Sequence, residues 1–415
     1  MPPPKILVIG NYRQTITLIR SLTKAGYHVI VGREDKRVFT QYSRYTSEIW
    51  PHPDIEKSEE AFASALAKYL ADRQDIDFIF PIGETDIICL MHYPEAIPSS
   101  VGLVMADPCV TSTCLDKFRC YEMVSGLGIP QAPFRKAYNY ASLLAAAEEI
   151  GYPCVIKPNN SLTTLFGRKA LIVHEFAELK RAIPAWPGSN KFLLLQRWMP
   201  GYRHNCHFVA DGTRLLAYFE QRVLRTDRLD GTGYGVDGIS IAPDPERKAH
   251  CESLVTALNY SGAGCIQFLV DEPSRSMSFL EINPRLDATC ALPYYCGYDF
   301  PRMAMQYAEY RRGTLASPPE NFSTYPVGKR GVWRWGDVHG WLQAVEMNSL
   351  DLRESAGWLK KIAVTFFSRD IDLIWSWRDP LPACYLFAGL ALFSTRVLIG
   401  KFRFHHRPRT REGPV

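Results

Sequence analysis

The 415-residue sequence predicts a doubly wound α/β domain, then an α+β domain with mostly antiparallel strands, then a mostly helical C-terminal extension. Three observations predict this order. Apolar runs alternate with amphipathic stretches over the first hundred residues, strand patterns joined by a tight turn follow, and tryptophans cluster near the end. Apolar residues make up 47% of the chain and charged residues 22%, which indicates a globular protein with more than one core.

The first domain is predicted from a β-α-β pattern. Residues 5–10 form an apolar run that ends in glycine, as expected for a parallel strand buried on both faces. An amphipathic stretch over 15–24 and a second apolar run over 27–31 complete the unit, and a helix over 59–73 and a strand over 78–80 continue it. A dinucleotide site is the alternative for the first turn, but that turn has one glycine where the fingerprint needs three. It can still hold a substrate anion at the helix N-terminus.

The middle of the chain reads as a second, mixed unit. A helix is expected over 113–130, where Pro130 marks a linker, and another over 140–150, followed by a strand over 154–158. Asp211-Gly212 predicts a hairpin turn. Further strands are expected over 192–196, 205–210, 215–222, 265–270 and 278–282.

The composition changes after about residue 313, where six of the nine tryptophans lie between residues 333 and 377. The apolar segment 381–400 is interrupted by Arg396 and contains Pro382, so it is short for a membrane span. A basic tail extends to Arg411. Two interpretations stay open: a helical unit packed on the core with a solvated tail, or peripheral docking on an anionic membrane through residues 381–411.

The net charge and the cysteine spacing give no support to nucleic-acid binding or to a common zinc site. The net charge of +5 is mild and does not call for nucleic acid. The eleven cysteines include no C-x-x-C pair and match no common zinc pattern. The start lacks the apolar core of a signal peptide, so we expect a reduced cytoplasmic location, peripheral on the membrane if the C-terminal segment docks. The oligomeric state stays open.

The polar residues with the clearest chemistry end two neighbouring predicted strands. Gln267 is followed fourteen residues later by Glu281, and then by Asn283 and Arg285. Amide and carboxylate oxygens are the ligands that Mg²⁺ prefers, and such a metal is usually shared with nucleotide phosphates. The planar fork of an arginine clamps a phosphate or a carboxylate. These residues predict a site that moves the terminal phosphoryl group of ATP.

Several motifs in order, over roughly residues 5–310, resemble the ATP-grasp superfamily of ligases, and in particular single-ATP-grasp proteins similar to carbamoyl-phosphate synthetases. The motifs are the β-α-β start, Asp116-Lys117, residues 151–158, residues 195–201, and residues 267–271 leading to 281–285. The resemblance implies a pre-ATP-grasp domain over 1–112, a small lobe with its linker helix over 113–198, a metal and catalytic lobe over 199–315, and an extension over 316–415.

The resemblance also implies ATP with Mg²⁺ or Mn²⁺ as cofactors. Lys157 and Lys117 would contact phosphates, although a solvated lysine in a first helical turn is the alternative for Lys117. His204 would contact the ribose, or is a strand-edge histidine. The hinge residues that would bind adenine are Gln196, Arg197, Trp198 and Met199, and the metal ligands would be Gln267, Glu281 and Asn283.

The implied reaction is carboxylate–amine ligation through an acylphosphate, with release of ADP and phosphate. Arg285 and Lys157 would be the catalytic residues, and the substrates a small-molecule or sugar-linked carboxylate and an amine. A nucleotide-binding scaffold without turnover is the alternative, favoured by Arg197 and Gln267, where many family members are acidic, and by the glycine-poor loop 159–167. Candidate acceptor residues are Glu84, Asp86, Arg222, Arg225, Tyr234 and Asp287.

Overall fold

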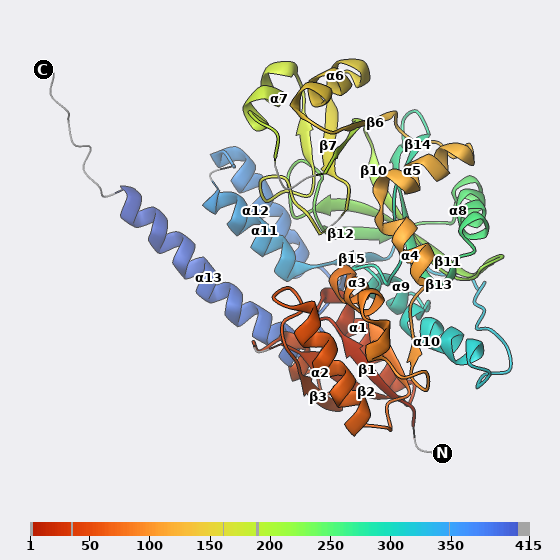
Figure 1. The fold of residues 1–415 in the computed structure, drawn as a ribbon. Helices are drawn as coiled ribbons and strands as arrows, with labels where there is room; N and C mark the ends of the chain where they lie inside the picture. The colour runs from red at the N-terminus through yellow and green to blue at the C-terminus, as the bar shows by residue number, and fades with distance from the viewer. Residues whose placement is uncertain (1–2, 35, 161, 188–190, 348, 406–415) are drawn as a thin grey trace, which may run out of the picture.

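The computed structural model describes residues 3–34, 36–160, 162–187, 191–347 and 349–405. Three sheets organise them. Figure 1 shows the N-terminal domain in red and orange at one end, the small lobe in yellow at the other, and the green strands of the largest sheet between them.

The N-terminal domain has a five-stranded parallel sheet in the order β3-β2-β1-β4-β5, which confirms the doubly wound prediction. On β1, Ile6 and Val8 pack in the cluster that contains α1, whereas Leu7 and Ile9 pack against α2. Helices therefore cover both faces of the sheet. The elements are β1 (Lys5–Ile9), α1 (Arg13–Lys24), β2 (His28–Arg33), η1 (Phe39–Tyr42), β3 (Glu48–Pro51), α2 (Glu59–Asp72), β4 (Phe78–Pro81), α3 (Glu84–His92), η2 (Pro94–Ala96) and β5 (Gly102–Leu103).

The single helix expected over 113–130 is wrong, because two helices occupy this region: α4 (Pro108–Leu115) and α5 (Lys117–Gly126). Asp116 separates them. Its backbone is extended, and its carboxylate accepts hydrogen bonds from the amides of Phe118 and Arg119. An aspartate at an N-cap starts a new helix in this way, and it sets the position of Lys117 in the first turn.

The small lobe is a four-stranded antiparallel sheet in the order β6-β9-β7-β8, and helices α6 and α7 share its apolar core. The elements are β6 (Phe134–Ala137), α6 (Tyr140–Ile150), β7 (Cys154–Pro158), β8 (Leu171–Val173), α7 (Phe176–Ala182) and β9 (Leu193–Arg197). The lobe places the end of β7, with Lys157, and the end of β9, with the hinge, on adjacent strands.

The largest sheet has seven strands in the order β14-β13-β10-β11-β12-β15-β16. The predicted hairpin is present between β10 and β11, where Gly212 takes a positive φ of 94° that suits glycine. The elements up to residue 311 are β10 (Tyr202–Asp211), β11 (Leu215–Thr226), β12 (Gly235–Ser240), α8 (Pro245–Leu258), β13 (Ser261–Asp271), β14 (Ser276–Asn283), α9 (Ala291–Tyr295) and α10 (Phe300–Arg311).

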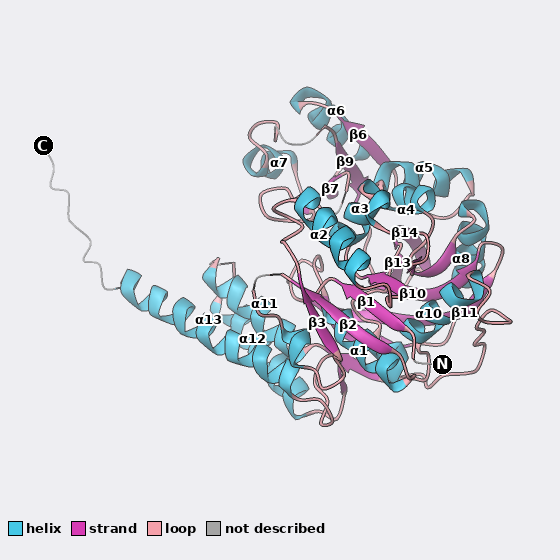
Figure 2. Ribbon diagram, turned by 60° about the horizontal axis from the view of Figure 1, so that its bottom comes forward, coloured by secondary structure: helices cyan, strands magenta, loops and turns pink. Residues whose placement is uncertain are grey.

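The C-terminal extension is mostly helical, as predicted, and it also completes the largest sheet. Its short strands β15 (Arg330–Val332) and β16 (Ile371–Asp372) form one edge of that sheet, so the expected boundary at 315/316 cuts through one layer. The helices are α11 (Arg334–Glu346), α12 (Leu352–Phe367) and α13 (Leu381–His405), and α13 projects from the body in Figures 1 and 2. None of the helices described is both long enough and apolar enough to cross a membrane.

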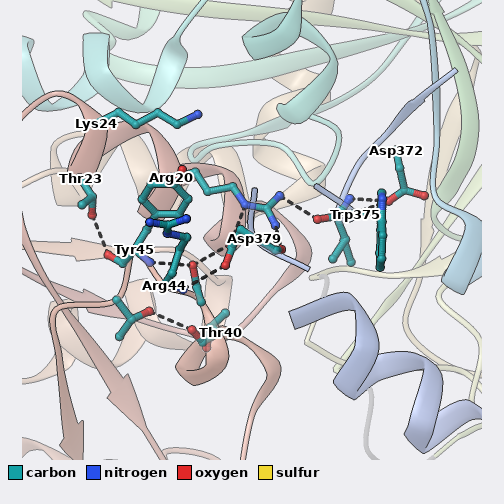
Figure 3. Close-up of polar contacts among 12 residues, drawn as sticks. Arg20, Thr23, Lys24, Thr40, Arg44, Tyr45, Asp372, Trp375 and Asp379 are labelled. Atoms are coloured by element: carbon teal, nitrogen blue, oxygen red, sulfur yellow. Dashed lines mark hydrogen bonds and ion pairs between the residues drawn. The ribbon is translucent and has the colours of Figure 1, made fainter. Parts of the chain in front are cut away.

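A buried ion pair fastens the extension to the N-terminal domain. The side chains of Arg20 on α1 and Asp379 before α13 are 4% and 1% exposed, and Nε lies 2.9 Å from Oδ2. Asp379 also accepts hydrogen bonds from the Ser43 hydroxyl (2.8 Å) and the Arg44 amide (3.0 Å). Figure 3 shows these contacts. The Trp377–Pro382 segment therefore has a structural role: it anchors the base of α13.

Candidate active site

Three neighbouring strands build the floor of the candidate site. Asn205 on β10 lies opposite Gln267 on β13, and Gln267 lies opposite Glu281 on β14. Side chains two residues apart in a strand share a face, so Asn283 projects beside Glu281. The register therefore brings the oxygens of Gln267, Glu281 and Asn283 together, as expected for a metal-binding set.

The donor set fits a hard divalent cation. The side-chain oxygen of Gln267 is buried and has no hydrogen-bond partner among the described residues, which is costly unless a ligand occupies it. Burial raises the pKa of Glu281, but Lys117, a 3.1 Å hydrogen bond from Asn283, Arg203 and Lys157 together lower it below its usual value. Glu281 is therefore an ionised carboxylate beside amide oxygens, which are suitable ligands for Mg²⁺ or Mn²⁺.

Lys157 is held at the end of β7 by a small hydrogen-bonded network. Its ammonium donates to the Gln196 side-chain oxygen (2.9 Å) and to the Tyr121 hydroxyl (3.3 Å), and Tyr121 donates to the Leu280 carbonyl (2.8 Å). Burial lowers the pKa of Lys157 to about 8, with Glu281 opposing the shift. The cation is positioned and poorly solvated, so an incoming phosphate gains more from it than from a surface lysine.

Lys117 also reaches the pocket, from the first turn of α5. Burial lowers the pKa of its ammonium, while the carboxylates of Glu281 and Glu84 act in the opposite direction. A cation at a helix N-terminus is unfavourable unless an anion lies nearby. Its place beside Lys157 and Glu281 is consistent with a phosphate contact and differs from that of a solvated surface lysine.

In the part of the chain that the structure describes, the hinge after β9 has two backbone carbonyl groups that accept no backbone hydrogen bond. The Arg197 amide donates to the Pro133 carbonyl (2.9 Å) and the Trp198 amide to the Pro153 carbonyl (3.1 Å). In an antiparallel pair, the opposite residue normally donates its own N–H in return. Pro133 and Pro153 have no N–H, so they cannot donate a hydrogen bond to the carbonyls of Arg197 and Trp198. The Arg197 guanidinium donates to the Ile150 carbonyl at the end of α6 (2.6 Å), so this arginine supports the hinge.

These groups line one pocket of about 300 Å³, which residues of the N-terminal domain, the small lobe and the largest sheet enclose together. Every residue predicted to act in catalysis, nucleotide binding or metal binding borders it, except His204. The residues brought together are Lys117, Lys157, Gln196, Arg197, Trp198, Met199, Gln267, Glu281, Asn283 and Arg285.

The structure does not bring His204 to this pocket. His204 is on β10 between Arg203 and Asn205, which line the pocket, so its side chain projects from the opposite face of the sheet. Burial lowers its pKa to about 3, and the nearby cations Arg247 and Arg222 add to the effect. Arg203 is at the pocket instead, held by a 3.1 Å hydrogen bond from its guanidinium to the Gly233 carbonyl.

Arg13 is a pocket residue that the sequence interpretation missed. It is the first residue of α1, and its guanidinium donates to the carbonyls of Ala288 and Gly235, each at 2.7 Å, above the Trp333 ring. The available signal was its position: it follows the carboxyl end of β1, where ligands bind to open α/β sheets.

Arg285, which follows β14, connects the largest sheet to the N-terminal domain through a 3.0 Å ion pair with Glu84. Glu84 and two other acceptor candidates, Tyr234 and Asp287, line the pocket. The remaining three are bonded elsewhere: Asp86 accepts from the Gly83 amide, Arg222 pairs with Glu272, and Arg225 pairs with Asp337.

Asp287 is a buried carboxylate at the far side of the pocket floor. It accepts hydrogen bonds from the Thr289 amide (2.8 Å) and the Asn205 side-chain amide (3.3 Å). Burial raises its pKa, but His207, the Thr289 hydrogen bonds and Arg285 lower it to about 2. Among the described residues it has no salt bridge, and the Asn205 side-chain oxygen has no hydrogen-bond partner. These two acceptors can receive a cationic ligand group.

Comparison with known proteins identifies the domain that carries this floor, since residues 114–289 match the ATP-grasp domain family. The carbamoyl phosphate synthase large chain of Ralstonia nicotianae is 28% identical over 208 residues, which are 47% of this chain and 18% of the relative. The chain therefore spans about a fifth of the length of that curated relative.

Solved structures extend the likeness in fold beyond residues 114–289. A biotin carboxylase–beta-gamma-ATP complex from Campylobacter jejuni superposes with a TM-score of 0.60 at 17% identity, covering 79% of this chain and 74% of that one. An L-amino acid ligase from Bacillus licheniformis gives 0.56 at 15% identity, with 74% of each chain covered. At these identities the likeness establishes the fold, and it confirms the predicted fold class.

Proposed function

We propose that this ATP-grasp protein is an ATP-dependent carboxylate–amine ligase that releases ADP and phosphate. One observation carries the proposal: an oxygen-ligand set, two lysines and Arg285 converge on a single pocket whose other wall is the N-terminal domain. The fold likeness to a protein described as an L-amino acid ligase is consistent with it. The substrate carboxylate attacks the γ-phosphate of ATP, ADP leaves, and an amine then displaces phosphate from the acyl carbon.

In this proposal the nucleotide spans the pocket from the hinge to the sheet. The open carbonyls of Arg197 and Trp198 accept hydrogen bonds from the adenine amino group, and Met199 packs beside the ring. Lys157 and Lys117 contact the phosphates as cations. Gln267, Glu281 and Asn283 would hold Mg²⁺ or Mn²⁺, which when bound neutralises charge on the β- and γ-phosphate oxygens.

Phosphoryl transfer depends mostly on positioning and charge stabilisation. Arg285 supplies the charge stabilisation, because its guanidinium lies in the pocket and its ion pair with Glu84 fixes its direction. Its Nε atom is buried without a partner among the described residues, which leaves a donor for an acylphosphate oxygen. Lys157 complements it from the small lobe.

The two acceptor subsites are assigned by charge. Arg13 and Arg203 offer guanidinium groups to the substrate carboxylate. Asp287 and Asn205 offer oxygens to the amine, which enters as an ammonium ion. The ammonium ion gives a proton to solvent water before the C–N bond forms, since only the neutral amine attacks the acyl carbon.

A screen for nucleotide products tests the ligase. Purified protein is incubated with ATP, Mg²⁺ and pooled carboxylates and amines, with Glu281→Gln as the matched control. The proposal expects ADP release that needs both pools and is lost in the variant. The second candidate, a nucleotide-binding scaffold, is favoured by the uncharged Gln267 in the metal set, which lowers the negative charge available to a cation. It expects bound ATP without product from any pool.

A further inference from the structure

The C-terminal helices and the loop between them expose large apolar side chains, although Phe366 also contacts Phe387 of α13 and Trp377 also contacts Trp375. On α12, Trp358 and Ile362 are buried against the body, at 4% and 8% exposure, so the packing of its inner face is accounted for. Its last residue, Phe367, is 91% exposed, and Trp377 in the following loop is 87% exposed. We call the following residues the C-terminal apolar surface: Leu359, Val364, Phe366, Phe367, Trp377 and Leu392.

This surface continues onto α13. Ala383 and Leu390 of that helix are buried, and Trp335 donates a 2.8 Å hydrogen bond to the Leu386 carbonyl, so the first half of α13 packs on α11. Leu392, however, is 76% exposed. Figures 1 and 2 both show the second half of α13 standing clear of the remaining layers. Isolated exposed apolar residues are ordinary, but several large ones on adjacent elements indicate a contact surface.

Between residues 359 and 405, beyond the acidic first turn of α12, the charge is one-sided. Residues 359–405 contain only three carboxylates, and arginines of the folded body pair with all of them: Asp370 with Arg330, Asp372 with Arg334, and Asp379 with Arg20. Four exposed cations of this region make no ion pair among the residues described: Lys360, Lys361, Arg369 and Arg378. The sequence adds Arg396, Lys401 and Arg403 along α13. The region therefore presents unbalanced positive charge beside its apolar side chains.

We propose that the C-terminal apolar surface binds the face of an anionic lipid bilayer. Tryptophan, phenylalanine and leucine insert at the headgroup boundary, and lysine and arginine around them attract anionic headgroups. The exposed cations match the charge of such a membrane. A nucleic acid would use the cations but gain little from Leu359, Val364 and Leu392, because aliphatic side chains do not stack on bases. The contact is peripheral, in keeping with the absence of a spanning helix among the described residues.

The proposed membrane contact does not depend on the end of the basic tail. Residues 406–411 of the segment expected to dock lie outside the described residues. The exposed aromatic residues and the four unpaired cations of α12 and its following loop are sufficient for the argument. The inference also does not depend on the ligase reaction, since none of these residues lines the pocket.

Co-sedimentation of the full chain with vesicles tests the proposal. One set of vesicles is phosphatidylcholine alone, and the other has one-third phosphatidylglycerol. We expect binding to the anionic vesicles at low salt, at least tenfold weaker binding to neutral vesicles, and a several-fold loss at high salt because surface charges are screened. Equal binding to both vesicle types, or none to either, would overturn the proposal.

Three variants, each with several substitutions, separate the contribution of apolar contact to vesicle binding from that of charge. The apolar variant is Phe367→Ser, Trp377→Ser and Leu392→Ser, and the charge variant is Lys360→Gln, Lys361→Gln, Arg369→Gln and Arg378→Gln. The matched control, Tyr138→Ser, Phe322→Ser and Val327→Ser, removes apolar groups that are 59%, 55% and 58% exposed elsewhere. All these side chains are exposed, so folding should persist, as checked by circular dichroism.

We expect each of the first two variants to lose at least tenfold in anionic-vesicle binding, and the control to lose less than twofold. An equal loss in the control overturns the assignment of the surface. Light scattering measures the oligomeric state and so tests the alternative that the C-terminal apolar surface binds a second copy of the chain. A dimer that the apolar variant dissociates, with no vesicle binding by the original protein, overturns the membrane proposal.

Discussion

The pair Arg20–Asp379 offers a sharp test of how the extension is held. Asp379→Ala leaves the Arg20 guanidinium, only 4% exposed, without its counter-charge, and removes the acceptor of Ser43 and the Arg44 amide. Breaking a buried pair by removing one partner costs about 3–5 kcal/mol. Arg20 also bonds to the backbone carbonyls of Ile374 and Asp379, at 2.7 and 3.0 Å, which satisfy donors but do not neutralise the charge. We therefore expect a loss of about 3–5 kcal/mol.

Hydrogen exchange of peptides from α1 and the start of α13 measures this free energy of local opening without assuming that the whole chain unfolds in one step. Asp370→Ala is the matched control, because its 3.6 Å pair with Arg330 is 20% and 32% exposed and should contribute no more than about 1 kcal/mol. The double variant Arg20→Met with Asp379→Leu removes both charges and should recover most of the loss. A loss below about 1 kcal/mol for Asp379→Ala, or a double variant as unstable as the single one, would refute the reasoning.

Three further predictions concern the pocket. Because burial lowers the Lys157 pKa to about 8, unliganded protein loses this cation as pH rises through 8, so ATP affinity measured by fluorescence titration should fall up to about tenfold per pH unit above it. Lys157→Arg should flatten that profile, and a flat profile in the original protein would contradict the assignment. Glu281→Gln should weaken Mg²⁺–ADP binding at least about tenfold in calorimetry and leave metal-free ADP binding nearly unchanged; equal losses would argue against a metal ligand. Asp287→Asn should raise KM for the amine about tenfold or more with KM for ATP unchanged, and a parallel rise in both would place Asp287 outside the amine subsite.

The sequence predicts the parts of this fold in which local pattern and burial agree. The apolar runs that became β1 and β4 are buried on both faces, and the helix over 140–150 begins and ends where it was expected. The convergence of Gln267, Glu281 and Asn283 was predictable because they lie on two paired strands, at positions whose side chains point to the same face of the sheet. The split between α4 and α5 was missed because Asp116 caps a helix inside a stretch with continuous helical periodicity.

Other features depend on contacts that pattern cannot supply. Arg203, His204 and Asn205 are all polar, so the sequence does not show which of them face the core and which face the pocket. The pairing of β10 with β13 decides this. Strands β15 and β16 have three and two residues, too few to form a pattern. Arg13 reaches the pocket only because the N-terminal domain packs over the largest sheet.

The most direct test of the central claim is the fate of carboxylate oxygen. The protein is incubated with ATP, Mg²⁺, pooled amines and a pool of ¹⁸O-labelled carboxylates, and the products are analysed by mass spectrometry. An acylphosphate intermediate predicts one ¹⁸O atom in the released phosphate, together with ADP, because the amine displaces phosphate with the carboxylate oxygen attached. Label in AMP would contradict the account, as would release of unlabelled phosphate with ADP.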